Sequence, residues 1–324
     1  METNKTIISR FLLLPALLAI SSISVNSQDW QLIEFPSYDH LTAVVMISAD
    51  SGLVVTASGY CFRTSDRGKS WQKSEIIKNI RIESVYFEDS QNGWACGHLG
   101  SIFKTSDGGS SWDDVSFDDI RAIFFDIEMK DARTGVAVGI RPLESNRYNG
   151  IAVKTVDGGK NWQIFEAPGL AYSEIRQSQA KNKMYFMAMG RLNISDDDGK
   201  SWQSVATLEG TPARTFSMYG STGIMAGPKG TCGYSNDSGK TWYSKKQDKK
   251  KSFLSSILLN SQYGYVAGSR GAMMVTIDGG INWTEEKTPL ELTILDMWYV
   301  DSYLFAVGSD GLIMYKEIRD KKPK

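Results

Sequence analysis

The octapeptide TSDGGSSW at Thr105–Trp112 recurs along the 324-residue chain in altered forms. Every form begins with Ser or Thr and has Asp at its third position, Gly at its fifth and Trp at its eighth. The other five forms end at Trp71, Trp162, Trp202, Trp242 and Trp283. Successive tryptophans are 40 or 41 residues apart, except for an interval of 50 between Trp112 and Trp162. A fixed period with turn chemistry in each unit is typical of a propeller or a solenoid.

A second signature precedes each box and distinguishes between these two architectures. Segments such as GWACG at Gly93–Gly97 and GYVAG at Gly264–Gly268 stand upstream of the boxes, and each follows a short apolar stretch such as Ile82–Phe87. Each unit therefore predicts four short β-strands, and no segment shows a long helical period. A β-helix needs shorter coils and helical repeats need a 3.6-residue period. The pattern thus predicts β-propeller blades.

The two ends of the repeat array indicate the number of blades. A seventh unit, Ala306–Ile318, supplies strands but is not followed by a box. Its missing outer strand is found at the other end, because Asp29–Phe35 matches Ser70–Ile76 and Trp30 lies 41 residues before Trp71. The sequence predicts an all-β, seven-bladed propeller of four-stranded blades, with the last blade closed by the N-terminal strand. This closure removes two exposed sheet edges.

Each box is expected to form the hairpin between the third and fourth strands of its blade. The Asp side chain accepts main-chain N–H groups in an Asx-type turn, and the Gly two residues later adopts a positive φ. The Trp begins the outer strand and covers the flank of the blade. The boxes are therefore predicted to be structural, through Asp66, Asp107, Asp157, Asp197, Asp237 and Asp278.

The N-terminal residues differ in kind from the repeats. A short basic lead is followed by the apolar run Phe11–Val25 and then by small and polar residues. This is the pattern of a secretory signal peptide, and the run is short for a membrane anchor, which is the alternative. We predict a signal peptide over 1–27, one propeller domain over 28–319 and a basic tail over 320–324. The mature protein is expected to be exported, either periplasmic or extracellular.

Charge and cysteine content exclude few partners. The formal net charge is −1, so bulk nucleic-acid binding is not expected. The odd set Cys61, Cys96 and Cys232 has no Cys-x-x-Cys spacing, so it predicts neither a zinc nor a redox site. The cysteines are expected to be small buried residues, although a bridge between Cys61 and Cys96 stays open.

Motifs that resemble cofactor or metal sites lack the required context. The Gly-Lys-Ser/Thr triplets of three boxes lack the glycine that a phosphate loop has five residues before Gly-Lys, and they precede strands, so they are not phosphate loops. The box beginning at Ser195 resembles a calcium loop, but Thr207 stands where the loop needs Glu. His40 and His98 are too few for a metal cluster. No cofactor or metal is predicted.

Carboxylates of the inner strands leave an enzymatic alternative open. Asp126, Glu128 and Asp296 are predicted in or near the strands that line the channel. Hydrolysis of a glycosidic bond needs two carboxylates about 5–10 Å apart across a pocket. Inner strands also carry isolated polar residues toward a wet channel, which favours a structural interpretation. No catalytic residue is therefore assigned.

Repeated boxes, with Ala-x-Gly signatures throughout the mature chain, resemble those of a known family. The unit GWACGHLGSIFKTSDGGSSW at Gly93–Trp112 is similar to the repeats of photosystem II stability/assembly factor-like proteins. These proteins are Asp-box, or bacterial-neuraminidase-repeat, propellers. The resemblance implies a non-catalytic protein-binding or assembly scaffold, whereas a sialidase-like hydrolase, the alternative, usually carries a Phe-Arg-Ile-Pro motif that this chain lacks. Fold transfers across such a resemblance more safely than partner does.

One face of the propeller is the candidate binding surface. Connectors between blades and turns between second and third strands share one face, here called the connector face, and the boxes lie on the other, the box face. A cationic surface for a protein partner in an envelope or membrane complex, or for an anionic peptide or glycan, is predicted on the connector face of a monomer. Its residues are Arg81, Arg121, Arg176, Arg214, His98, Arg191, Lys229, Arg270, Arg141 and Arg147. A merely solvated rim is the alternative.

Overall fold

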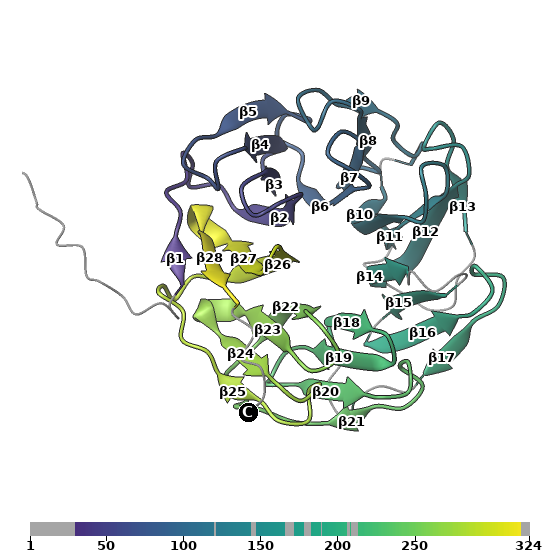
Figure 1. The fold of residues 1–324 in the computed structure, drawn as a ribbon. Helices are drawn as coiled ribbons and strands as arrows, with labels where there is room; N and C mark the ends of the chain where they lie inside the picture. The colour runs from purple at the N-terminus through teal and green to yellow at the C-terminus, as the bar shows by residue number, and fades with distance from the viewer. Residues whose placement is uncertain are drawn as a thin grey trace, which may run out of the picture.

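The chain forms a closed ring of seven four-stranded antiparallel sheets around a central channel (Figure 1). The structure is a computed structural model that describes residues 30–119, 121–143, 147–165, 172–177, 183–188, 190–205, 208 and 213–318. The predicted signal peptide and basic tail lie outside these residues. The predicted seven-bladed all-β fold is confirmed.

Within each blade, strands follow one another from the channel outward. Blade 1 consists of β2 (Leu41–Met46), β3 (Gly52–Thr56), β4 (Tyr60–Thr64) and β5 (Gln72–Glu75). Blade 2 consists of β6 (Ile82–Phe87), β7 (Gly93–Gly97), β8 (Ile102–Thr105) and β9 (Asp113–Asp114). Blade 3 consists of β10 (Ile123–Met129), β11 (Gly135–Pro142), β12 (Tyr148–Thr155) and β13 (Gln163–Ile164). Blade 4 consists of β14 (Tyr172–Gln177), β15 (Met184–Ala188), β16 (Arg191–Ser195) and β17 (Gln203–Val205). Blade 5 consists of β18 (Thr215–Tyr219), β19 (Thr222–Ala226), β20 (Cys232–Ser235) and β21 (Tyr243–Ser244). Blade 6 consists of β22 (Phe253–Leu258), β23 (Gly264–Gly268), β24 (Met273–Thr276) and β25 (Thr284–Glu285).

The seventh blade joins the two ends of the chain, as the sequence predicts. It contains β26 (Ile294–Val300), β27 (Tyr303–Gly308), β28 (Ile313–Glu317) and, as its outer strand, β1 (Gln31–Leu32). β1 pairs antiparallel with β28, and the Ile33 N–H extends the pairing by donating to the Ile313 carbonyl at 3.0 Å. Trp30 is buried beside β28 in the core between blades 6 and 7. The ring is therefore held shut by main-chain bonds and an apolar anchor.

The hydrophobic core lies between blades. The described residues form seven buried clusters, and each draws its members mainly from two neighbouring blades. Between blades 1 and 2, for example, Val45 and Leu53 pack with Val85 and Phe103. The sheets bury both faces, so β3, β7 and β23 are almost wholly apolar instead of alternating.

The box tryptophans belong to these cores. Trp112 packs on the cluster between blades 1 and 2, and its own blade is blade 2. Trp162 of blade 3 likewise packs on the cluster between blades 2 and 3. Each of these two rings thus seals the junction with the preceding blade, and so does more than cover the flank of its own blade.

The cysteines are free thiols in the blade cores. Cys61, Cys96 and Cys232 are all buried and unbridged, so the bridge between Cys61 and Cys96 that the sequence left open is not formed. Burial raises the pKa of Cys61 and Cys232 to about 12. These thiols are unsuited to nucleophilic or metal chemistry at neutral pH.

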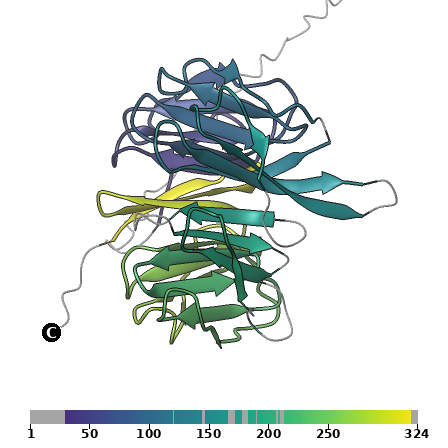
Figure 2. The same ribbon diagram turned by 90° about the vertical axis from the view of Figure 1, so that its right-hand side faces the viewer.

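One hairpin departs from the regular pattern. Strands β11 and β12 extend beyond the ring on the side of the second-to-third turns, and Figure 2 shows the projecting pair. They correspond to the 50-residue interval in the repeat. The insertion therefore lengthens an existing hairpin and leaves the blade itself unchanged.

Candidate binding face and channel

Hydrogen bonds assign the turns to the two faces. On the connector face, the glycine of a second-to-third turn bonds to the connector that follows its blade: Gly100 N–H donates to the Ala122 carbonyl at 2.7 Å, and Gly230 N–H to that of Lys251 at 2.7 Å. On the box face, Gly108 N–H donates to Gln91 at 2.9 Å, which joins the box of blade 2 to its first-to-second turn. The predicted division of the loops is therefore present.

Each box is a turn held together by hydrogen bonds of two side chains, that of its first residue and that of its aspartate. In the first box, Asp66 Oδ1 accepts the N–H of Ser70 at 2.9 Å, and Asp66 Oδ2 accepts its hydroxyl at 2.7 Å. The Thr64 hydroxyl donates to Asp66 at 2.8 Å and accepts the N–H of Gly68 at 2.8 Å. The two bonds of the Thr64 hydroxyl recur at the first residue of the other boxes. The aspartate and the first residue of the box both form their hydrogen bonds within the turn, which favours a structural role for the box aspartates.

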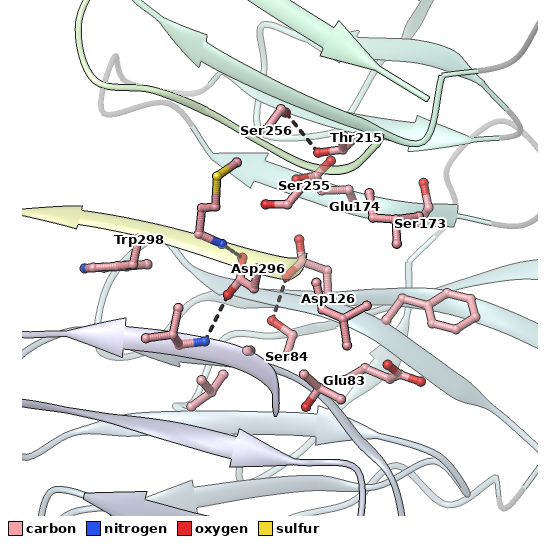
Figure 3. Close-up of a pocket in the computed structure, with 18 of the residues that line it drawn as sticks. Glu83, Ser84, Asp126, Ser173, Glu174, Thr215, Ser255, Ser256, Asp296 and Trp298 are labelled. Atoms are coloured by element: carbon pink, nitrogen blue, oxygen red, sulfur yellow. Dashed lines mark hydrogen bonds between the residues drawn. The ribbon is translucent and has the colours of Figure 1, made fainter. Parts of the chain in front are cut away.

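The channel contains a cavity of about 390 Å³ lined by the inner strands. Its described lining includes the carboxylates of Glu83, Asp126, Glu128, Glu174 and Asp296, together with the single cation Arg214 (Figure 3). The lining is therefore mainly acidic.

Two of the carboxylates weighed for catalysis bind main-chain groups. Asp126 Oδ2 accepts the N–H of Ile175, in the next blade, at 3.0 Å, while its Oδ1 accepts the Ser84 hydroxyl at 2.8 Å. Asp296 Oδ2 accepts the N–H of Val44 across the closing seam at 3.0 Å. Each carboxylate thus connects neighbouring blades.

A backbone irregularity places these acceptors. Six inner strands shift register by one residue near their start, and Asp126, Glu174 and Asp296 each follow such a bulge. A bulge redirects a side chain relative to the regular pleat. Glu174 Oε2 accepts the N–H of Phe216 in blade 5 at 2.8 Å, which repeats the Asp126 contact one blade on. Glu174 was not among the carboxylates predicted to line the channel, although its position after an inner-strand start matches that of Asp126.

The candidate cations of blades 2 and 3 are paired with carboxylates. Arg81 Nε lies 2.7 Å and His98 Nε2 lies 3.0 Å from the same oxygen of Glu83. Arg121 and Arg141 share Asp119, at 3.4 Å and 2.5 Å. These acids were not among the predicted site residues, because nothing in the spacing of Glu83 or Asp119 marks either as the partner of an arginine two residues away.

The remaining cations form an exposed arc from blade 3 to blade 6. Arg214 stands at the start of β18 and lines the channel, while Lys229 and Arg270 occupy the tips of second-to-third turns at φ 56° and 55°. None of these cations makes an ion pair within the described part of the chain. The arc consists of Arg147, Arg191, Arg214, Lys229 and Arg270, all exposed. The side chain of Arg176 lies outside the described residues.

The described residues contain no group of three or more His, Cys, Asp or Glu side chains arranged to hold a metal ion. Within the same residues, no helix is long and apolar enough to span a membrane.

Together, the fold and boxes define an Asp-box β-propeller with a cationic arc on its connector face. The family model described as "Photosynthesis system II assembly factor YCF48" matches residues 22–120, and this match confirms the resemblance inferred from the repeats. No curated protein matches the chain in sequence.

Solved structures share the architecture over most of the chain. One titled "YCF48 bound to D1 peptide" has a TM-score of 0.74 and 19% identity, and covers 91% of this chain and 99% of its own. "YCF48 from Cyanidioschyzon merolae" has a TM-score of 0.71 and 14% identity, covering 89% and 98%. The WD40 propeller domain of Doa1 has a TM-score of 0.69 and 11% identity, covering 89% and 96%. At these identities the likeness concerns the fold.

Proposed function

We propose that this chain is an exported, non-catalytic scaffold that binds an anionic region of a protein partner through the cationic arc of its connector face. The observation that carries the proposal is the arc itself, in which exposed arginines and a lysine from successive blades make no ion pair within the described residues. Clustered cations without internal partners favour an anionic ligand. The similar YCF48 structure with a bound D1 peptide supports a protein ligand.

The channel chemistry supports a non-catalytic role. A general acid or base needs a carboxyl group that is available to the substrate. Asp126 and Asp296 instead receive N–H groups from neighbouring blades, so their removal would disturb the ring. The hydrolase alternative is therefore not favoured. Export rests on the predicted leader over 1–27.

Charge reversal tests the arc. We expect the double variant Arg191→Glu and Lys229→Glu to lose capture of partners from the native envelope fraction, while its melting temperature stays close to that of the parent. A matched double variant on the box face, Lys160→Glu and Lys240→Glu, should keep capture. Wild-type capture should weaken as salt rises, since exposed charges are screened beyond about 10 Å at 0.1 M salt. Equal capture by both double variants would reject the arc as the binding surface.

A further inference from the structure

The projecting β11–β12 hairpin has two strand edges beyond its blade. Pairing with the inner strand β10 ends at the Ile123–Ile140 pair, and the outer strand β13 pairs only with Val153 and Lys154. Between these limits and the tip, β11 and β12 pair with each other. A two-stranded ribbon of this kind exposes main-chain donors and acceptors on both sides.

Two main-chain hydrogen bonds show which main-chain groups point outward on β12. Arg147 accepts the N–H of Leu143 at 2.8 Å, so its carbonyl faces β11. Ala152 accepts the N–H of Phe165 at 2.8 Å, so its carbonyl faces the outer side. Because direction alternates along an antiparallel strand, Tyr148 and Gly150 direct both N–H and C=O to the outer side. Within the described residues, no hydrogen bond occupies these four groups.

The opposite edge is closed by proline. The same alternation directs Ile140 and Pro142 of β11 toward the channel side. Ile140 is already opposite Ile123, and Pro142 has no N–H to donate. On that side Arg141 is also paired with Asp119. Strand addition is therefore possible on the β12 edge and disfavoured on the β11 edge.

Side chains around the open edge indicate the character of the ligand. Arg147 is exposed and has no ion pair in the described part of the chain. Tyr148 is 52% exposed, and Ile164 of the neighbouring outer strand is 62% exposed. A strand added to this edge would continue the line of β13 and meet one cation and two apolar side chains. An extended segment that alternates apolar and acidic residues fits these neighbours.

We propose that the β12 edge at Tyr148–Gly150 is a strand-addition site for an extended, acidic segment of a partner protein. The proposal rests on the proposed function and adds its mode of binding: the hairpin captures main chain, while the arc supplies charge. Strand addition gives affinity through main-chain bonds and specificity through alternate side chains.

A synthetic peptide tests the edge without an identified partner. The probe is a fluorescein-labelled octapeptide of alternating valine and glutamate, and its control carries N-methyl groups on alternate peptide nitrogens. Fluorescence anisotropy should show saturable binding of the probe and none of the methylated peptide. Hydrogen exchange should show that the probe protects the Tyr148 and Gly150 amides. Absence of saturable binding, or protection elsewhere only, would overturn the proposal.

Single substitutions separate main-chain from side-chain recognition. Gly150→Pro removes an outward N–H but no bond to β11, so the variant should fold normally and bind the probe at least about tenfold more weakly. Tyr148→Ala keeps its N–H and should retain most of the binding. Unchanged binding of the probe by a folded Gly150→Pro variant would overturn the proposal. A concentration-dependent dimer of the parent that this substitution abolishes would also overturn it, because a second copy of the chain would then occupy the β12 edge.

The two proposals fail in different ways. If Gly150→Pro captures partners from the native envelope fraction as well as the parent does, while the arc reversal abolishes capture, the strand-addition site is wrong and the proposed function stands. If the probe binds the hairpin but envelope capture is insensitive to arc charge, the assignment of the arc is wrong.

Discussion

Residues at the fourth position of different boxes differ in the conformational free energy that their backbone costs. The fourth box position has a positive φ in Arg67, Asp198 and Ser238, as it does in the glycines of the other boxes. Such a conformation costs a non-glycine residue about 1–2 kcal/mol. A positive φ was predicted only for the glycine at the fifth position. The box therefore contains two consecutive left-handed residues, and a side chain at the fourth position is strained there unless its other contacts offset the cost.

Arg67 has such compensation and Ser238 does not. The Arg67 guanidinium lies 4.1 Å from the ring centroid of Tyr303 in blade 7, and its Nε donates to the Ala49 carbonyl at 3.0 Å. No side-chain hydrogen bond of Ser238 occurs within the described residues. Arg67 thereby joins blade 1 to blade 7 at the seam.

We therefore predict opposite effects of glycine at these two positions. Ser238→Gly should stabilise the protein by about 0.5–1 kcal/mol, because it removes conformational strain. Arg67→Gly should destabilise it by about 1–2 kcal/mol, because the lost contacts outweigh that gain. Urea unfolding gives both values. Stabilisation of similar size by both substitutions would show that Arg67 contributes nothing to the seam.

Acid should destabilise the boxes together. Hydrogen bonds from Ser70, Asn161 and Ser201 lower the pKa values of Asp66, Asp157 and Asp197 to about 2. The main-chain N–H of Ser111 is the largest cause of a similar lowering to about 2 at Asp107.

Because these pKa values are lower in the folded state, the charged boxes stabilise the fold above the unfolded pKa, near 3.8. That stability should be lost progressively as the pH falls from about 4 to about 2. The urea midpoint measured across this interval checks the prediction. A midpoint that stays constant between pH 4 and pH 2 would contradict it.

At the scale of elements, one short strand completes the ring. β1 contributes two paired residues, yet it is accompanied by buried Trp30 and covers the edge of β28. Loss of the segment would expose that edge and open the core between blades 6 and 7.

Deletion of residues 28–35 should therefore abolish the single cooperative melting transition or cause aggregation, relative to a chain that begins at Gln28. Differential scanning calorimetry with a sedimentation measurement tests this. Unchanged melting of the shortened chain would show that the ring closes without β1.

At the scale of the whole molecule, inner-strand carboxylates join neighbouring blades, including the first and last blades of the chain. Asp296 and Val44 meet across the seam, and Asp126 meets Ile175 between blades 3 and 4. A carboxylate acceptor removed from a buried N–H leaves that group without a partner, which costs about 1–3 kcal/mol.

Asp126→Ala should accordingly destabilise the protein by about 1–3 kcal/mol, whereas Asp126→Asn, which keeps a carbonyl acceptor, should cost less. Partner capture by the folded Asp126→Asn variant should equal that of the parent. A variant that folds normally but loses function would instead assign Asp126 to a site in the channel.

Much of the architecture was predictable because it is encoded locally and repeated. A turn such as Thr105–Trp112 has the same hydrogen-bonding needs wherever it occurs, so its period reveals the blades. The match between Asp29–Phe35 and Ser70–Ile76 similarly revealed the closure. These inferences need only chemistry between residues close in sequence, and the structure confirms them.

Charge pairing and strand edges were decided by tertiary structure. The sequence places Arg81 and Arg214 alike, at or near the start of an inner strand, but only the fold brings Glu83 to Arg81 and leaves Arg214 exposed without an ion pair in the described chain. The fold likewise shows the 50-residue interval as an extended hairpin whose β12 edge, beyond its pairing with β13, meets no other strand within the described residues, and whose β11 edge ends in Pro142. Whether two charges form an ion pair depends on the distance between them in space. Whether a strand edge can accept another strand depends on the direction in which its main-chain N–H and C=O groups point. The spacing of residues in the sequence specifies neither.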